Sequence, residues 1–237
     1  MSTPSATPSG PDLLANAAVA PVKSGMMVGL GTGRAAFRGV RALAARVQAE
    51  KLSITCVSTS QATEDLAKSL GLKVVDFGGV ERVDFLFDGA DEVDPQLRMT
   101  KGGGAAMTRE RIVVAAARES VNIIDHTKLV DRLGLKMPLP IEIIPLAAAS
   151  IRPRLKELGL DGPIRPRKDG PGHLITDNGS LIIDVALPAS GPGWGDVTAL
   201  AAKLDVMTGV VDHGLFIREA QVVLVEDAQG HVTRRTR

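Results

Sequence analysis

The sequence predicts an α/β protein with a doubly wound, mostly parallel, Rossmann-like sheet and a second, smaller α+β domain. Three observations lead to this prediction. Short apolar runs typical of strands alternate with helical patterns up to about residue 133. Polar residues and glycines gather directly after these runs, where open α/β sheets place their ligands. From residue 134 onward prolines interrupt the pattern, which indicates a separate unit.

The strands and helices of the main sheet are expected in the first half of the chain. A leader rich in Ser, Thr and Pro, residues 1–11, is expected to be disordered. Apolar runs of strand length occur at residues 26–30, 53–57, 73–76, 84–87 and 121–124. Helical patterns, the first of them rich in alanine, occur at residues 35–50, 63–70 and 109–118. Strands that alternate with helices in this way favour a parallel sheet.

The sequence of the second half of the chain predicts the smaller domain, followed by strands that rejoin the main sheet. Prolines break the chain around residues 141–144, and helices are expected after them at residues 147–158 and 196–204. Strands are expected at residues 174–176 and 181–185, and the turn Asp177-Asn178-Gly179 between them is typical of a hairpin. The last apolar runs, residues 214–217 and 222–225, are expected to rejoin the main sheet. The predicted division is a main domain of residues 12–133 and 208–237, and a smaller domain of residues 134–207.

The composition argues against several classes of function. With 28 Lys and Arg against 27 Asp and Glu in 237 residues, the net charge of +1 gives little support to nucleic-acid binding or to binding at a membrane surface. Cys56 is the one cysteine, which excludes an internal disulfide, and its apolar surroundings indicate a core residue. No Cys/His cluster has metal-ligand spacing. Without a spanning apolar run or a signal pattern, we expect a soluble, cytoplasmic protein.

The first candidate binding segment is a glycine-rich turn between a strand and a helix. The turn, Gly31-Thr32-Gly33, exposes backbone N–H groups and the positive end of a helix dipole, which bind anions such as phosphate. A tight turn without a ligand would have the same pattern, and Arg34 at the helix start either binds the phosphate or lies in solvent. A dinucleotide or methyl-donor loop would need an acidic residue after the next strand, and residues 57–60 contain none.

The second segment, residues 84–110, predicts proton-transfer chemistry. After its apolar strand come four carboxylates, which are costly there unless they meet cations, a metal ion or a substrate: Asp88, Asp91, Glu92 and Asp94. Lys101 precedes three glycines whose N–H groups can help it to stabilise a developing oxyanion: Gly102, Gly103 and Gly104. Glu110 lies in the first turn of the next helix, with Thr108 as the expected N-cap; alone it would be an ordinary helix-stabilising carboxylate. Together these groups suit proton abstraction next to a carbonyl.

The third segment is the sequence D-H-T-K at residues 125–128, directly after the strand expected at residues 121–124. A lysine and a hydroxyl at the end of a strand suit a phosphate or the hydroxyls of a sugar. Taken alone, Lys128 would be an ordinary surface charge.

These segments together resemble the A-type ribose-5-phosphate isomerase family. The resemblance covers nearly the whole chain after the leader, with the motifs G-L-G-T-G at 29–33, T-S-Q-A-T at 59–63, D-G-A-D-E-V-D at 88–94, K-G-G-G-A-A-M-T-R-E at 101–110, D-H-T-K at 125–128, L-P-I-E-I-I-P at 139–145, T-D-N-G at 176–179 and G-V-V-D-H-G-L-F at 209–216. It implies an aldose–ketose isomerase of the non-oxidative pentose phosphate pathway that interconverts D-ribose 5-phosphate and D-ribulose 5-phosphate. It also implies a sugar phosphate as the binding partner, neither a metal nor an organic cofactor, and a homodimer or homotetramer.

The resemblance also implies roles for individual residues. Glu110 would move a proton between C2 and C1 through a cis-enediol(ate), and Asp88, Asp91 and Lys101 would open the ring and stabilise the enediolate. Which of the two aspartates opens the ring is left open. The implied substrate contacts are Gly31, Thr32, Gly33, Arg34, Ser60, Thr63, Gly102, Gly103, Gly104 and Lys128.

The phosphate loop departs from the family pattern. The family usually has G-T-G-S-T-A, whereas Arg34 and Ala35 replace both hydroxyl residues here. A lysine often found in the family's N-terminal helix is also missing, and residues 11–13 stand in that region. We expect Arg34 to replace these donors by charge-assisted hydrogen bonds. The alternatives are an isomerase of a different sugar phosphate, a sugar-phosphate sensor without turnover, and a metal-dependent enzyme that uses Asp88, Asp91 and Asp94.

Overall fold

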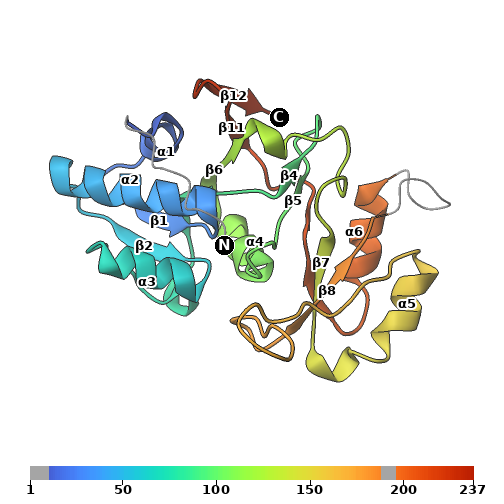
Figure 1. The fold of residues 1–237 in the computed structure, drawn as a ribbon. Coiled ribbons are helices and arrows are strands. Elements are labelled where there is room, and N and C mark those ends of the chain that lie inside the picture. Colours follow the sequence, from blue (N-terminus) through green and yellow to red (C-terminus); the bar gives the residue numbers. More distant parts are fainter. Residues whose placement is uncertain (1–10, 188–195) are drawn as a thin grey trace.

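The structure of the protein is a computed structural model that describes residues 11–187 and 196–237. Its central sheet consists of β1 (Met27–Leu30), β2 (Thr55–Ser58), β3 (Val83–Asp88), β6 (Ala117–Asp125), β11 (Val222–Glu226) and β12 (Val232–Thr236). The strand order is β12-β11-β6-β3-β1-β2 (Figure 1). All neighbours are parallel except the edge strand β12, which runs antiparallel to β11. The predicted α/β class with a mostly parallel, doubly wound sheet is therefore confirmed.

The two faces of this sheet are covered by different helices, because successive side chains of a strand point to opposite faces. Phe85 and Phe87 of β3 belong to the core formed with α1 (Leu13–Val19) and α2 (Arg34–Glu50). Leu86 packs with Val113 of α4 (Met107–Ala115) on the other face. Gly39 allows α2 to approach the sheet, since a Cβ there would lie 2.6 Å from the Phe87 ring. After β2 comes α3 (Gln61–Ser69).

A second group of elements lies beside the central sheet (Figure 1). It contains a three-stranded sheet in the order β8-β7-β9, formed by β7 (Leu139–Ile143), β8 (Leu181–Val185) and β9 (Val210–His213). Two helices share a hydrophobic core with this sheet, α5 (Ile151–Glu157) and α6 (Val197–Asp205). A third sheet has the order β10-β5-β4 and is made by β4 (Glu92–Val93), β5 (Met99–Thr100) and β10 (Leu215–Phe216). The described part of the chain also contains three short 3₁₀ helices: η1 (Phe77–Gly79), η2 (His126–Lys128) and η3 (Pro145–Ala147).

Several predicted strands are wrong. Residues 73–76 form no strand, because Val74 makes a single bridge to Cys56. Residues 174–176 form no strand either, since this segment turns at residue 176 around the Thr176 hydroxyl. The run at residues 214–217 does not rejoin the main sheet, because Leu215 and Phe216 pair with β5 instead. The run at residues 222–225 does rejoin it as β11.

The prolines that predict a break do not prevent a strand at β7. Pro140 lies inside this strand opposite Asp184 of β8, whose N–H donates to the carbonyl of Pro163 and not to β7. On the other side of β7, the carbonyl of Gly214 accepts from the Lys101 N–H, so the missing N–H of Pro140 leaves that acceptor satisfied. The Pro140 carbonyl accepts from the N–H of Gly214. On its other side β7 pairs with β9, which lies beyond the predicted limit of the smaller domain at residue 207. The division into two domains itself stays a prediction.

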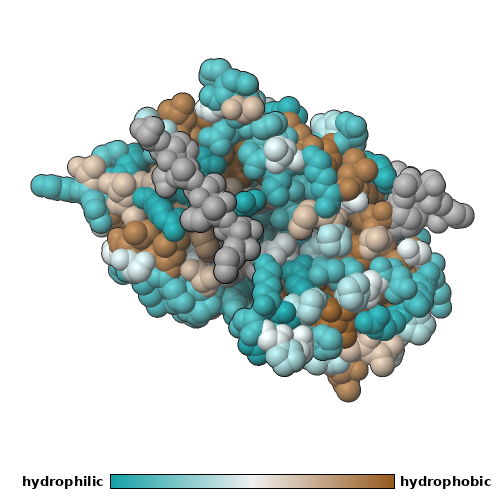
Figure 2. Space-filling model, in the orientation of Figure 1, coloured by the Kyte–Doolittle hydropathy of each residue, from teal (hydrophilic) through white to brown (hydrophobic). Residues whose placement is uncertain are grey.

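The surface mixes hydrophobic and hydrophilic side chains (Figure 2). On the face seen in Figure 2, hydrophobic side chains occur in separate patches with hydrophilic ones between them. Within residues 11–187 and 196–237, no helix combines the length and the apolar character needed to cross a bilayer. Of the predicted leader, residues 1–10 lie outside the described part of the chain.

Candidate active site

A cavity of about 410 Å³ opens where β1, β3 and β6 end. These three strands are parallel neighbours, so the loops that follow them meet at one edge of the sheet. The loop after β1 and the first turn of α2 contribute residues 32–35, and the loop after β3 contributes residues 89–91. Residues 123–125 and 128 come from β6 and η2. The glycine turn at residues 101–104 and Glu110 of α4 complete the lining. All three segments that the sequence singles out therefore meet here.

Glycine at position 31 allows the loop after β1 to pass the end of β3. A Cβ on Gly31 would lie 2.1 Å from Oδ1 of Asp88, so a larger residue does not fit. The close approach lets the Thr32 N–H donate to the same oxygen over 3.0 Å. Gly33 has a φ of 100° and is the N-cap of α2, and no side chain caps this helix. The first turn of α2 therefore presents backbone N–H groups to the cavity, as a site for an anion requires.

A buried cluster of one lysine and two carboxylates forms the centre of the site. The Nζ of Lys101 lies 2.9 Å from Oδ2 of Asp88 and 3.5 Å from Oε1 of Glu110. It also donates to the carbonyl of Gly89 over 2.5 Å. Each of the three side chains is at least nine-tenths buried, so solvent weakens these interactions little.

Burial acts in opposite directions on the pKa values of Glu110 and Lys101. Burial first, and the negative charge of Asp88 second, raise the pKa of Glu110 to about 8. Burial alone would lower the pKa of Lys101, but the charges of Asp88 and Glu110 outweigh it and raise that pKa. Oε2 of Glu110 is buried and has no hydrogen-bond partner among the described residues. Glu110 is therefore a carboxyl group that can both accept and release a proton near neutral pH, with one oxygen free for a ligand.

Asp91 occupies the side of the cavity next to the glycine turn. Its Oδ2 accepts a hydrogen bond from the Gly103 N–H over 2.7 Å. Gly102 has a φ of 100°, which disfavours any other residue, and a Cβ there would lie 2.7 Å from the Pro140 ring. The sequence predicts that the N–H groups of this turn serve an oxyanion. That of Gly103 is engaged by Asp91 instead.

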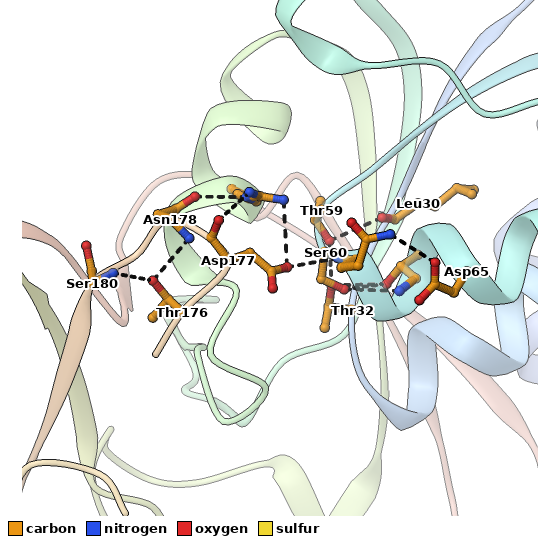
Figure 3. A network of polar contacts seen from close by, with 12 residues as sticks. Leu30, Thr32, Thr59, Ser60, Asp65, Thr176, Asp177, Asn178 and Ser180 are labelled. Carbon is orange, nitrogen blue, oxygen red and sulfur yellow. Dashed lines mark hydrogen bonds and ion pairs between the residues drawn. The ribbon is translucent and has the colours of Figure 1, made fainter. Parts of the chain in front are cut away.

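The predicted substrate contacts Ser60 and Thr63 do not line the cavity. Their hydroxyls gather with that of Thr59 around the Thr32 hydroxyl, at distances of 2.7 to 3.1 Å from it. Figure 3 shows Thr59 and Ser60 beside Thr32. Ser60 also caps α3, and the Thr63 hydroxyl donates to the carbonyl of Gly31. Through these hydrogen bonds to Gly31 and Thr32, the hydroxyls fix the loop after β1 without lining the cavity themselves. The motif T-S-Q-A-T thus has a supporting role, and the cap on α3 was the signal for it.

Besides Lys101, three cationic side chains line the cavity, and sequence reasoning missed one of them. Arg34 is exposed at the start of α2 and Lys128 is half-buried in η2; neither has an ion pair among the described residues. Arg38, one turn after Arg34 on the same helix, is the missed residue. It is held by Asp12 at 2.6 Å and Glu226 at 3.0 Å, and these hydrogen bonds raise its pKa. The i, i+4 spacing from Arg34 was the available signal.

One further expectation for this region is wrong. Ala106, not Thr108, is the N-cap of α4, and the Thr108 hydroxyl donates to the buried carboxylate of Glu142. Asp94 lies away from the cavity, where it pairs with Arg98 at 2.6 Å. Glu92 is likewise engaged elsewhere, by the backbone N–H groups of residues 134, 136 and 137. Among the described residues, no group of three or more Asp, Glu, His or Cys side chains is arranged to hold a metal ion.

Comparison with known proteins gives a consistent result. Residues 55–230 match the family model of ribose 5-phosphate isomerase A, also called phosphoriboisomerase A. Ribose-5-phosphate isomerase A of Synechococcus sp. (strain WH7803) is 39% identical over 220 residues, which cover 92% of this chain and 91% of the relative. The enzyme of the same name from Agrobacterium fabrum (strain C58 / ATCC 33970) is 41% identical, with 91% and 93% covered.

Solved structures agree with these sequence matches. The ribose 5-phosphate isomerase A from Methanocaldococcus jannaschii superposes with a TM-score of 0.88 at 37% identity, over 94% of this chain and 96% of the other. A D-ribose-5-phosphate isomerase in complex with phospho-erythronic acid superposes with a TM-score of 0.89 at 33% identity, over 95% and 97% of the two chains.

Proposed function

The chain belongs to the ribose 5-phosphate isomerase A family, and we propose that the cavity at the ends of β1, β3 and β6 is its active site. The protein is an aldose–ketose isomerase that interconverts D-ribose 5-phosphate and D-ribulose 5-phosphate. The observation that carries the assignment of the site is the buried cluster of Asp88, Lys101 and Glu110, with one oxygen of Glu110 free. A sugar that enters the cavity would meet this oxygen.

In the proposed mechanism Glu110 moves a proton between C2 and C1 through a cis-enediolate. A C–H group next to a carbonyl is a poor acid, so the base must be close and the developing negative charge must be stabilised. A pKa of about 8 suits Glu110 to both directions of the transfer, because the group can be regenerated near neutral pH. The ammonium of Lys101 supplies the positive charge for the oxyanion. Asp88 and Asp91 are the carboxylates available to take the anomeric hydroxyl proton when the ring opens.

We place the phosphate at the first turn of α2. The uncapped N–H groups after Gly33 and the charged side chains of Arg34 and Lys128 all line the cavity. A phosphate there would accept backbone hydrogen bonds and a bidentate contact from the guanidinium. This site replaces the two hydroxyls of the usual family loop by Arg34 and by backbone donors.

Replacing Arg34 with alanine tests this placement. We expect KM for ribose 5-phosphate to rise at least about tenfold, since a charge-assisted contact to phosphate contributes roughly 1.5–3 kcal/mol. The value of kcat should change less, because the phosphate is bound equally in the ground and transition states. Arg41→Ala removes an exposed arginine from the same helix and serves as the control. An unchanged KM in Arg34→Ala would place the phosphate elsewhere.

The function itself is tested by measuring conversion of ribose 5-phosphate to ribulose 5-phosphate by the purified protein in excess chelator. We expect ordinary enzymatic turnover with the chelator present. Other aldose phosphates, assayed in parallel, would reveal a shifted preference caused by the altered loop. Loss of turnover on chelation would contradict the metal-free mechanism. A folded protein that binds the sugar phosphate without turnover would be a sensor. The expectations of a homodimer or homotetramer and of a cytoplasmic location stay predictions.

A further inference from the structure

An arginine from the second group of elements reaches the glycine turn of the active site. Arg165 lies between α5 and β8, and its Nη1 donates to the carbonyl of Gly102 over 2.8 Å. Asp184 of β8 holds the other side of the guanidinium with two hydrogen bonds, of 2.8 Å from Nε and 2.6 Å from Nη2. The side chains of Arg165 and Asp184 are 13% and 17% exposed, so the pair is largely shielded from solvent. This bidentate pairing fixes the direction of the guanidinium.

The carbonyl that Arg165 contacts belongs to the peptide unit that also holds Asp91. In the Gly102–Gly103 peptide the carbonyl accepts from Arg165 and from the Ala105 N–H, and the N–H donates to Oδ2 of Asp91 over 2.7 Å. A cation at a carbonyl polarises the amide and makes its N–H a better donor. The chain of contacts thus runs from Asp184 through Arg165 and one peptide group to Asp91.

Within its own turn, the carbonyl of this peptide is held by one hydrogen bond, from the Ala105 N–H, and Arg165 adds a second from another segment of the chain. The peptide unit is flanked by glycine on both sides, and glycine leaves the backbone free to adopt other conformations. A flipped peptide would turn a carbonyl oxygen, instead of an N–H, toward the carboxylate of Asp91. Gly103 already lies so close that a Cβ on it would be 2.8 Å from Oδ1 of Asp91. A change in the turn would therefore be felt directly by this aspartate.

We propose that Arg165, oriented by Asp184, is a positioning residue that fixes the Gly102–Gly103 peptide and through it the carboxylate of Asp91. The inference rests on the proposed function, in which Asp91 acts on the bound sugar. Arg165 itself does not line the cavity. It acts on the reaction through the backbone, and it makes the active site depend on the β8 segment.

The test is a kinetic comparison of Arg165→Ala, Arg165→Lys and Arg167→Ala with the wild type. For Arg165→Ala we expect kcat to fall about tenfold or more, because small displacements of catalytic groups cost up to about 10²-fold, while KM changes less than about threefold. Arg165→Lys keeps the charge but loses the bidentate pairing with Asp184, so its kcat should lie between those of the wild type and Arg165→Ala. Arg167 is exposed and paired with Asp169 two positions along the same segment, and Arg167→Ala should leave kcat unchanged.

A double-mutant cycle with Asp91→Asn separates positioning from a general loss of stability. If Arg165 acts through Asp91, Arg165→Ala should lower kcat much less in the Asp91→Asn background than in the wild type. Equal fold-losses in both backgrounds, or an unchanged kcat in folded Arg165→Ala, would overturn the inference. If Arg165→Ala does not fold, the same cycle with Arg165→Lys decides by the same criterion. A wild-type protein without isomerase activity would instead refute the proposed function, so the two failures are distinguishable.

Discussion

Glu110→Gln is expected to lower kcat by about 10²- to 10⁴-fold, the range that a positioned general acid–base contributes. The amide has nearly the shape of the carboxyl group, but it cannot carry the proton between C2 and C1. KM for ribose 5-phosphate should change little, because the phosphate contacts at α2 are untouched. Steady-state kinetics in both directions of the isomerisation measure the effect. The exposed Glu157 of α5, changed to Gln, is the matched control.

The pH dependence gives a second measurement on the same residue. The base form of Glu110 is required and its pKa is about 8, so kcat/KM of the wild type should fall as the pH is lowered below about 8. The residual activity of Glu110→Gln should lack this dependence. A variant that keeps more than a tenth of the wild-type kcat, or the same pH profile, would remove Glu110 from the proton-transfer step.

Glu110→Gln should be less active than the wild type but more stable as the pH is raised. The folded-state pKa of Glu110 is raised from 4.5 to about 8, so the native state holds this proton more tightly than the unfolded state. The stabilisation from this group is complete below about pH 4.5 and is lost as the pH rises through about 8. Glutamine has no proton to lose. Glu110→Gln should therefore gain in Tm relative to the wild type as the pH is raised from 5 to 8.

The sequence was sufficient for those parts of the fold and site that depend on local patterns. Apolar runs that end in glycine or aspartate predict β1, β3 and β6, and parallel neighbours necessarily bring the loops after them to one edge. The sequence motifs single out four side chains that lie together in the structure: Asp88, Asp91, Lys101 and Glu110. The positive φ of Gly33 and Gly102 likewise agrees with the turns expected there.

The features that the sequence did not predict depend on contacts between distant segments. Ser60 and Thr63 have hydroxyls that suit a phosphate, and only the position of the loop after β1 shows that these hydroxyls are used to hold it. Arg38 is one of several arginines of α2, and only its contacts with Asp12 and Glu226 distinguish it. Arg165 is 63 residues from Gly102 in sequence, and no local pattern connects the two. Specific long-range hydrogen bonds are therefore the information that single-sequence reasoning lacks.

Lys101→Met is expected to damage both activity and stability. Methionine has a similar length and no charge, so the developing oxyanion loses its cation, and we expect kcat to fall about 10²- to 10³-fold. The carboxylates of Asp88 and Glu110 would remain buried without their shared partner. Removing one member of a buried ion pair costs roughly 3–5 kcal/mol of unfolding free energy. Since Lys101 lowers the pKa of Glu110, its loss should also move the activity profile to higher pH.

The double variant Lys101→Met with Asp88→Asn separates the two effects. Neutralising Asp88 removes the uncompensated buried charge, so a large part of the lost unfolding free energy should return in chemical denaturation. Activity should not return, because no cation is restored for the enediolate and Asp91 is then the one ring-opening carboxylate that remains of the proposed pair. If the double variant regained activity together with stability, Lys101 would serve only to neutralise Asp88 in the folded protein. If neither returned, the other contacts of the Lys101 ammonium would be the larger contribution: its hydrogen bond to the Gly89 carbonyl and its position 5.5 Å from the centre of the Phe216 ring. The comparison thus tests whether the charge of Lys101 acts on the substrate or only on the fold.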